Sequence, residues 1–176
     1  RNLQFAQISI AGVAVFTGGM NKGFNSAANK AGVKPSCFVA GTLVMAVAGM
    51  VAIEKIKSGD KVISTDPETM ETSPKTVLET YIREVTTLVH LTVNGEEIVT
   101  TVDHPFYVKN QGFIKAGELI VGDELLDVNG NVLLVENFDV ELTEEPVKVY
   151  NFEVDEFHTY HVGEIGVWVH NANADY

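Results

Sequence analysis

The stretch TTLVHLTVNGEEIVTTV, residues 86–102, decides the fold class of this 176-residue chain. It contains two runs rich in apolar and β-branched residues, Thr86–Val93 and Glu97–Val102, on either side of Asn94-Gly95. Asn-Gly is the typical sequence of a two-residue type I′ turn, because both turn positions need a positive φ angle. The stretch therefore predicts a β-hairpin.

The same pattern continues on both sides of this hairpin. Further strands are predicted at Val47–Ile56, Lys61–Thr65, Thr76–Arg83, Glu124–Val128, Val132–Phe138, Val147–Val154, His158–Val162 and Gly166–His170. Turn signals separate them, among them Ser73-Pro74 and a second hairpin signal at Asn129–Asn131. A helical period is visible only over single turns, at Glu54–Lys57 and Ala116–Ile120. The fold class is predicted to be all-β.

A short internal repeat lies within this β-rich region. The sequence IKSGDKVI at residues 56–63 aligns with LIVGDELL at residues 119–126. Both contain an apolar residue, two intervening positions, Gly-Asp, a charged residue and two apolar residues. The pattern predicts a turn in which glycine takes a demanding dihedral angle, followed by a strand that enters the core. Two similar halves favour a pseudo-two-fold arrangement in which the ends of both halves meet at a shared centre.

Charge divides the chain into two unlike segments that join near Pro35. Residues 1–36 carry +4 and no carboxylate, and the net charge of −12 therefore leaves −16 on residues 37–176. Such an acidic segment is a poor candidate for binding nucleic acid, since phosphate binding needs clustered Lys and Arg, and no nucleic-acid partner is predicted. The apolar run Ile8–Phe16 is too short to span a bilayer, so no membrane association is predicted.

Cys37 is the only cysteine, which excludes an internal disulfide and a cysteine-based zinc cluster. No metal or cofactor is predicted. A thiol at this position can attack the carbonyl of the Ser36-Cys37 bond and form a thioester. Near the other end, the side-chain amide of Asn171 can attack its own backbone carbonyl and release Ala172. Both reactions need a fold that protonates the leaving amine and stabilises the developing oxyanion.

Histidines accompany both ends of this segment. In TTVDHP, residues 100–105, Thr101 can face an oxyanion and the imidazole of His104 can give a proton to a departing amide nitrogen. At the other end, His170 directly precedes Asn171. Two residues separate His158 from His161, so on a strand these two side chains face opposite ways and at most one points to a shared site.

Taken in order, these motifs resemble the Hint (hedgehog–intein) superfamily. The resemblance rests on Cys37, Thr101/His104, the Tyr150–Thr159 stretch and the terminal His170-Asn171. It covers about residues 37–171 and looks most like a bacterial intein-like domain without an endonuclease insertion. It implies a horseshoe-like fold of short strands, with a self-processing domain at residues 37–171 between flanking segments 1–36 and 172–176. It also implies that His158 belongs to the site, which leaves His161 exposed.

The resemblance implies an N-to-S acyl shift at Ser36-Cys37. Cys37 is then the nucleophile, and His104 polarises or protonates the Cys37 amide nitrogen. Thr101 helps to hold the tetrahedral intermediate, and Asp103 is a supporting residue. The thioester passes to water, or to an outside thiol or amine.

At the other end the resemblance implies cyclisation of Asn171, with His170 and His158 as acid and oxyanion partners. Two departures from inteins favour cleavage over splicing. Ala172 stands where an intein needs Cys, Ser or Thr to accept the acyl group. Asn151 stands where several inteins carry an Asp that assists coupling, and an amide cannot act as a base. We therefore expect mainly cleavage, with low-level splicing.

The expected partners are the flanking segments themselves, on which a monomer acts in cis. The resemblance implies a bacterial secreted or toxin-like host protein. Two other classes of function stay open from the residues alone. One is a trans-acting Cys-His peptidase or thiol hydrolase. The other is a non-catalytic β binding module, with adventitious Zn²⁺ at Cys37 and a histidine.

Overall fold

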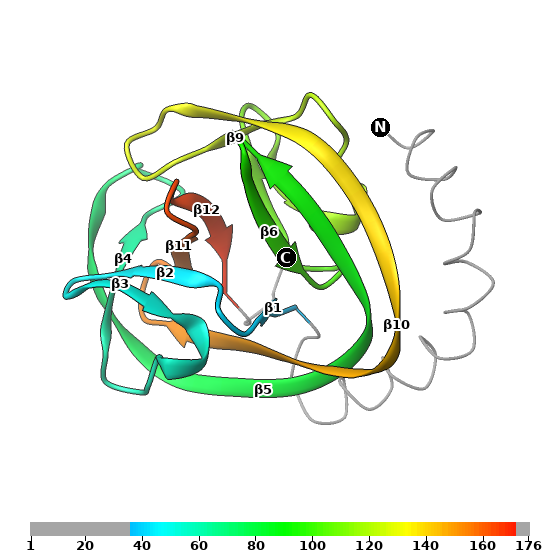
Figure 1. Ribbon diagram of the computed structural model, residues 1–176. Helices are drawn as coiled ribbons and strands as arrows, with labels where there is room; N and C mark the ends of the chain where they lie inside the picture. The colour runs from blue at the N-terminus through cyan, green and yellow to red at the C-terminus, as the bar shows by residue number, and fades with distance from the viewer. Residues whose placement is uncertain (1–35, 172–176) are drawn as a thin grey trace.

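Two long strands, β5 (Thr72–Val93) and β10 (Val132–Val154), form the frame of the fold in the computed structural model, which describes residues 36–171. They pair antiparallel from Val77↔Val154 to Val93↔Val135. The pair curves around the outside of the molecule, with β1, β11 and β12 inside the curve (Figure 1). The all-β, horseshoe-like architecture expected from the sequence is confirmed.

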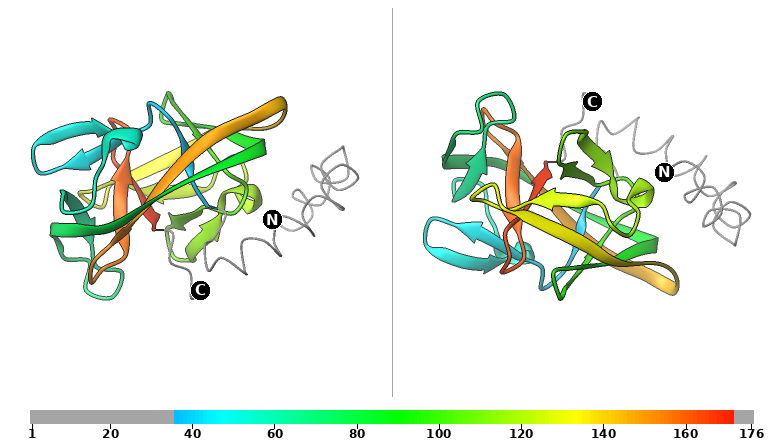
Figure 2. Two further views of the ribbon diagram at one scale, coloured as in Figure 1. Left: turned by 90° about the horizontal axis from the view of Figure 1, so that it is seen from below. Right: turned by 90° about the horizontal axis from the view of Figure 1, so that it is seen from above.

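Ten shorter strands complete the sheet. They are β1 (Phe38–Val39), β2 (Leu43–Ala46), β3 (Gly49–Ala52), β4 (Lys61–Thr65), β6 (Glu96–Thr100), β7 (Pro105–Val108), β8 (Gly112–Lys115), β9 (Glu124–Leu126), β11 (Thr159–Val162) and β12 (Val167–His170). The strand order is β11-β12-β7-β9-β10-β1-β6-β5-β4-β2-β3, with β8 paired to β7. A bridge between β11 and β2 folds the sheet back on itself, and β5 and β10 run side by side in both views of Figure 2.

Helical structure in residues 36–171 is confined to short 3₁₀ turns. The turns η2 (Ile53–Lys55) and η3 (Ala116–Glu118) lie where single helical turns are predicted. No helix in this part of the chain has the length and apolar character needed to cross a membrane.

The internal repeat corresponds to the same turn built twice. Gly59 and Gly122 have φ angles of 95° and 98°, a region that favours glycine. The carboxylates of Asp60 and Asp123 each accept a hydrogen bond from the backbone N–H three residues earlier, both at 2.9 Å. Each turn follows a 3₁₀ turn and leads into a strand, β4 or β9, that pairs with a long strand, β5 or β10. The repeat in the sequence therefore corresponds to the same turn and following strand in both halves of the structure.

The Asn-Gly hairpin is confirmed in detail, because Asn94 and Gly95 both have positive φ angles, 47° and 87°. The second predicted hairpin, between β9 and β10, also forms. Its turn is of another kind, since only Gly130 has a positive φ angle. There the Asp127 carboxylate accepts two backbone N–H groups of the loop, both at 2.8 Å, and holds the turn.

The sequence predicts two short strands in each half where the structure has one long strand. Pro74 lies within β5, opposite Ile63 of β4. β5 pairs with β10 only from Val77 onward, so the missing N–H of Pro74 interrupts no pairing on that side. In β10, Pro146 falls inside a register shift between Leu142 and Val147. The irregular pairing accommodates Pro146, and the strand continues beyond it.

The core lies inside the curve, and its aromatic side chains surround His104. Phe38 packs against the imidazole with ring centroids 4.2 Å apart. Phe106 and Tyr160 stand edge-on at 6.0 and 6.3 Å. All four side chains are fully buried, so this histidine lies in a dry, apolar environment.

Candidate active site

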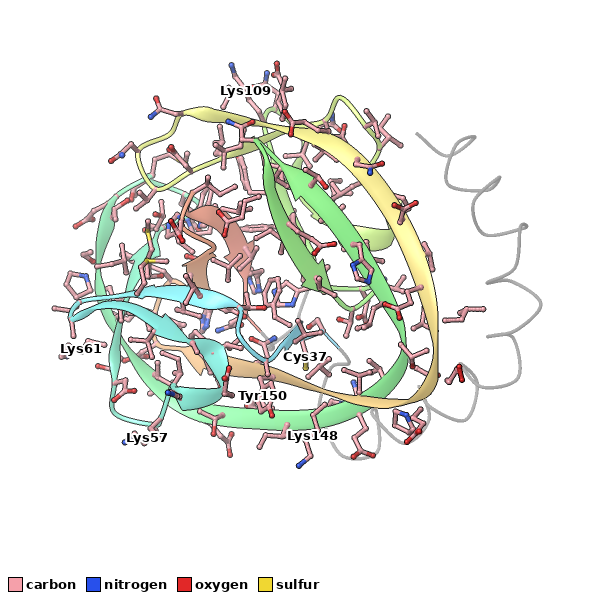
Figure 3. The ribbon with its side chains drawn as sticks, viewed as in Figure 1. Cys37, Lys57, Lys61, Lys109, Lys148 and Tyr150 are labelled. Atoms are coloured by element: carbon pink, nitrogen blue, oxygen red, sulfur yellow. The ribbon has the colours of Figure 1, made fainter. Side chains whose placement is uncertain are left out.

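The Ser36–Cys37 bond, here the N-terminal junction, directly precedes β1, and Figure 3 shows Cys37 inside the curve of β5 and β10. Residues at the end of β6 hold the Cys37 backbone. Thr101 Oγ1 accepts the Cys37 N–H at 2.9 Å. The Thr101 N–H and the Thr100 hydroxyl donate to the Cys37 carbonyl at 3.0 and 3.1 Å. The Thr101 hydroxyl itself donates to Asp103 Oδ1 at 3.2 Å. The sequence-predicted Thr101 and Asp103 therefore lie at this junction.

The carbonyl oxygen of the same bond has its own partner. Asn151 Nδ2 donates to the Ser36 carbonyl oxygen at 2.5 Å. The other end of this amide is also occupied, because Asn151 Oδ1 accepts the Phe152 N–H at 2.8 Å and the Tyr160 hydroxyl at 2.6 Å. Tyr160 was not among the site residues predicted from the sequence, since nothing in the sequence shows that β10 and β11 place it beside Asn151.

Burial raises the pKa of the Cys37 thiol to about 12, although Arg83 lowers this pKa and Asp103 adds to the rise. Arg83 lies on β5 opposite Val149 of β10, and β10 is the neighbour of β1. The thiol is therefore protonated at neutral pH, with a guanidinium close enough to favour its ionised form. Arg83 was not predicted from the sequence. Its only signal there is its rarity, since Arg1 is the only other arginine in the chain.

Asn171 and two histidines meet at the end of β12. His170 Nδ1 lies 3.3 Å from the carbonyl oxygen of Asn171, which belongs to the Asn171–Ala172 bond, here the C-terminal junction. The Asn171 N–H donates to the His158 carbonyl at 2.8 Å, and its side-chain Nδ2 donates to the Val154 carbonyl at 3.4 Å. The rings of His158 and His170 stack at 6.4 Å. Ala172 lies outside the described residues.

His104 contacts a residue next to each junction. Its Nε2 lies 2.9 Å from the His170 carbonyl oxygen. A carbonyl only accepts, so Nε2 carries the proton and Nδ1 keeps its lone pair. Within residues 36–171, Nδ1 is buried without a hydrogen-bond partner. Burial lowers the pKa of His104 to about 3, against the opposing effect of the His170 hydrogen bond. The ring packs on Phe38, the neighbour of Cys37, so one neutral imidazole contacts the residue after Cys37 and the residue before Asn171.

The prediction that His161 is exposed is wrong. Its side chain is fully buried, with Nε2 2.8 Å from Thr65 Oγ1 and Nδ1 2.9 Å from the Gly166 carbonyl. All four residues of β11 are buried, so both faces of this strand are covered and alternation does not lead to solvent. His158 precedes β11 with a φ angle of 59° instead of lying on the strand. His161 is a structural core residue.

The buried histidines should make folding stability depend on pH. Burial lowers the pKa of His161 and His170 to about 4 each. In the unfolded chain these groups protonate near pH 6.5, so stability should fall as the pH drops from about 6.5 toward 4. Each should add up to about 1.4 kcal/mol per pH unit to that slope.

His161→Gln should therefore flatten the pH dependence of unfolding, as measured by urea titrations between pH 4 and 7. The background should be Cys37→Ala/Asn171→Ala, so that no cleavage intervenes. Equal slopes with and without His161 would contradict the assignment of a neutral, buried imidazole.

Comparisons with known proteins identify the family and the fold of this chain. The family model of the Pretoxin HINT domain matches residues 43–172. The solution structure of a bacterial intein-like domain from Clostridium thermocellum is 64% identical, with a TM-score of 0.75, over 77% of this chain and 98% of that chain. The Ssp DnaB mini-intein variant M86 is 13% identical, with a TM-score of 0.69, over 81% of this chain and 98% of its own. This second likeness shows the fold alone.

One curated sequence, DNA-directed RNA polymerase III subunit rpc2 from Dictyostelium discoideum, is 29% identical over 84 residues. The match covers 45% of this chain and 5% of that protein, so it carries no functional argument. The family match, in contrast, spans well over half of the chain. This protein therefore belongs to the Pretoxin HINT family, and its β domain is a self-processing, intein-like domain of the Hint superfamily.

Proposed function

We propose that the domain cleaves its own chain at both junctions and that cleavage predominates over splicing. One observation carries this proposal. The two polar atoms of the Ser36–Cys37 peptide bond are each held by a side chain that is distant in the sequence, the nitrogen by Thr101 and the oxygen by Asn151. Such positioning of a bond next to a nucleophile is a large part of catalysis.

At the N-terminal junction, the Cys37 sulfur forms a bond to the Ser36 carbonyl carbon while the thiol proton passes to His104 Nδ1. The C–N bond then breaks, and the Cys37 nitrogen takes this proton from the imidazolium. The pKa values of about 12 for the Cys37 thiol and about 3 for the His104 imidazole disfavour a thiolate–imidazolium ion pair before the reaction. Proton transfer therefore accompanies the attack. Thr101 orients the leaving nitrogen, and water or an outside thiol or amine consumes the thioester.

At the C-terminal junction, Asn171 Nδ2 leaves the Val154 carbonyl and attacks its own backbone carbonyl carbon. His170 Nδ1 stabilises the oxygen of that carbonyl, to which it is already close, and His158 supports the His170 ring. The Asn171–Ala172 bond breaks, and the Ala172 nitrogen takes the proton that leaves Nδ2. The domain then ends in a succinimide.

The geometry counts against a trans-acting peptidase. Such an enzyme needs an open cleft, whereas Cys37 and His104 have no exposed surface and Ser36 has 1%. The identity to an intein-like domain likewise counts against a purely binding module. We propose residues 1–36 and 172–176 as the flanks on which a monomer acts, without metal or cofactor, in a secreted or toxin-like host.

The products test this function. The purified chain should yield leader 1–36 with a free carboxylate, domain 37–171 and tail 172–176, as measured by intact mass over time. Dithiothreitol should speed N-terminal cleavage, and hydroxylamine should trap the thioester as a leader hydroxamate. A chain that stays intact under both reagents would contradict the proposal.

Restoring an acyl acceptor tests why cleavage should predominate. Ala172→Cys should raise the fraction of ligated flanks, because its thiol can take the acyl group from Cys37 before water does. Mass spectrometry of the joined segments 1–36 and 172–176 measures this fraction. If the parent chain ligates its flanks as efficiently, the missing nucleophile is not limiting and direct attack by the Ala172 amine must replace this mechanism.

A further inference from the structure

The Ser36 carbonyl oxygen gains negative charge when sulfur adds to its carbon. Only one side chain is placed on that oxygen in residues 36–171, through the 2.5 Å hydrogen bond from Asn151 Nδ2. Thr101, expected from the sequence to hold the intermediate, accepts from the Cys37 nitrogen on the other side of the bond. The two roles, orientation of the leaving nitrogen and stabilisation of the oxyanion, therefore fall on different residues.

We propose that Asn151 is a catalytic residue that acts as the oxyanion donor of the N-terminal step, and that Tyr160 is its positioning residue. The proposal rests on the self-cleavage proposed above and assigns the oxyanion in it. As the Cys37 sulfur bonds to the Ser36 carbon, the carbonyl π pair moves onto oxygen beside Nδ2–H. The pair returns when the C–N bond breaks, and the proton from the thiol ends on the Cys37 nitrogen. Asn151 stays neutral throughout and exchanges no proton.

The orientation of this amide is fixed by its other end. Asn151 Oδ1 accepts from the Phe152 N–H and from the Tyr160 hydroxyl at 2.6 Å. A flipped amide would place its NH₂ group against the Phe152 N–H and its oxygen against the Ser36 carbonyl oxygen, so Nδ2 must face Ser36. Tyr160 is fully buried, and its ring lies against Phe152 with centroids 4.2 Å apart. The donor is therefore in place before the reaction begins, which is where such groups are most effective.

The chemistry of an amide suits this position. A neutral Nδ2–H donates at any pH, whereas a carboxylate there would repel the developing oxyanion. Asn151→Asp keeps the shape and reverses this interaction. Protonation of the aspartate restores a donor, so the variant should lose activity at neutral pH and recover part of it as the pH falls.

The experiment follows thiol-induced cleavage at the N-terminal junction in the full chain with dithiothreitol, and release of the tail 172–176 in the same samples. Asn151→Ala should slow N-terminal cleavage by about 100- to 1,000-fold, the usual effect of removing one oxyanion donor. Tyr160→Phe should slow it by up to about tenfold, the effect of losing one neutral hydrogen bond. Tail release should stay near the parental rate in all variants.

Two matched substitutions serve as controls. Asn137→Ala removes another β10 asparagine, whose side chain is exposed and bonds only locally. Tyr107→Phe removes a hydroxyl from a tyrosine on β7 that stacks on Trp168. Both should cleave like the parent.

A ground-state readout separates positioning from a general loss of structure. In a Cys37→Ala background, the ¹³C shift of the Ser36 carbonyl should move upfield in Asn151→Ala, and part of the way in Tyr160→Phe. Parental N-terminal cleavage in Asn151→Ala, an equal loss at both junctions, or an unchanged carbonyl shift would overturn the proposal. If the parent forms no hydroxamate, the proposed function fails instead, and the carbonyl shift still reports whether Asn151 holds the oxygen.

Discussion

Cys37→Ala should abolish cleavage at the N-terminal junction, with or without dithiothreitol. A methyl group has no electron pair to attack the Ser36 carbonyl, and no other cysteine exists in the chain. Cys37→Ser should retain slow cleavage that does not respond to thiols, because an ester exchanges with thiols far less readily than a thioester. Intact mass spectrometry of timed samples measures both rates. Since the parent side chain is fully buried and small, both variants should keep the fold.

The C-terminal junction provides the control for this prediction. Tail release should persist in both Cys37 variants, because Ala172 offers no step that links the two ends. The Asn171 side chain and the His170 ring that serve this junction come from β12 and its end, not from β1. Loss of tail release in Cys37→Ala, with an intact fold by NMR, would contradict the independence of the two cleavages.

Features set by local interactions could be predicted from the sequence. Asn94-Gly95 forms its turn because few other residue pairs accept two successive positive φ angles. The Gly-Asp turns at residues 59–60 and 122–123 each contain a hydrogen bond from a backbone N–H to the carboxylate three residues later, so this part of their geometry lies within the eight-residue repeat. Cys37, Thr101, His104, His170 and Asn171 could be proposed as site residues for a similar reason, since each carries its chemistry in its own side chain.

Features that depend on strand neighbours were missed or assigned incorrectly. Pro74 predicts the end of a strand. It does not end β5, because β5 has no β10 partner before Val77 and the missing N–H interrupts no pairing there. His161 reads as exposed, and it is buried because β11 is covered on both faces. Arg83 and Tyr160 approach the N-terminal junction only through the register of β5, β10 and β11. No local pattern in the sequence encodes that register.

The role of Asn151 shows how such a neighbour changes an interpretation. Considered alone, Asn151 is an amide at a position where several inteins carry a base, and this predicts weaker coupling of the two steps. In the structure the same amide is held by Tyr160 and donates to the Ser36 carbonyl oxygen. The residue type was visible in the sequence, but the atom that it contacts was not.

His104→Ala should slow cleavage at the N-terminal junction by at least about 100-fold, the lower range for the loss of a general acid–base. The variant removes Nδ1, whose lone pair is proposed to accept the proton from the thiol and pass it to the amide nitrogen. It also removes Nε2, which donates to the His170 carbonyl at 2.9 Å. Because that bond holds the backbone next to Asn171, tail release should slow as well, by up to about tenfold. Timed mass spectrometry of both junctions in one sample gives the two rates.

His104→Gln separates the two ring nitrogens. Its side-chain NH₂ reaches the position of Nε2 and can keep the hydrogen bond to the His170 carbonyl, but it supplies no base at the position of Nδ1. N-terminal cleavage should therefore be lost as in His104→Ala, while tail release returns toward the parental rate. If His104→Gln cleaves the N-terminal junction as fast as the parent, the imidazole carries no proton. If instead both variants slow tail release equally, the bond to His170 does not explain the effect at the C-terminal junction, and His104 must act there by filling the space among Phe38, Phe106 and Tyr160.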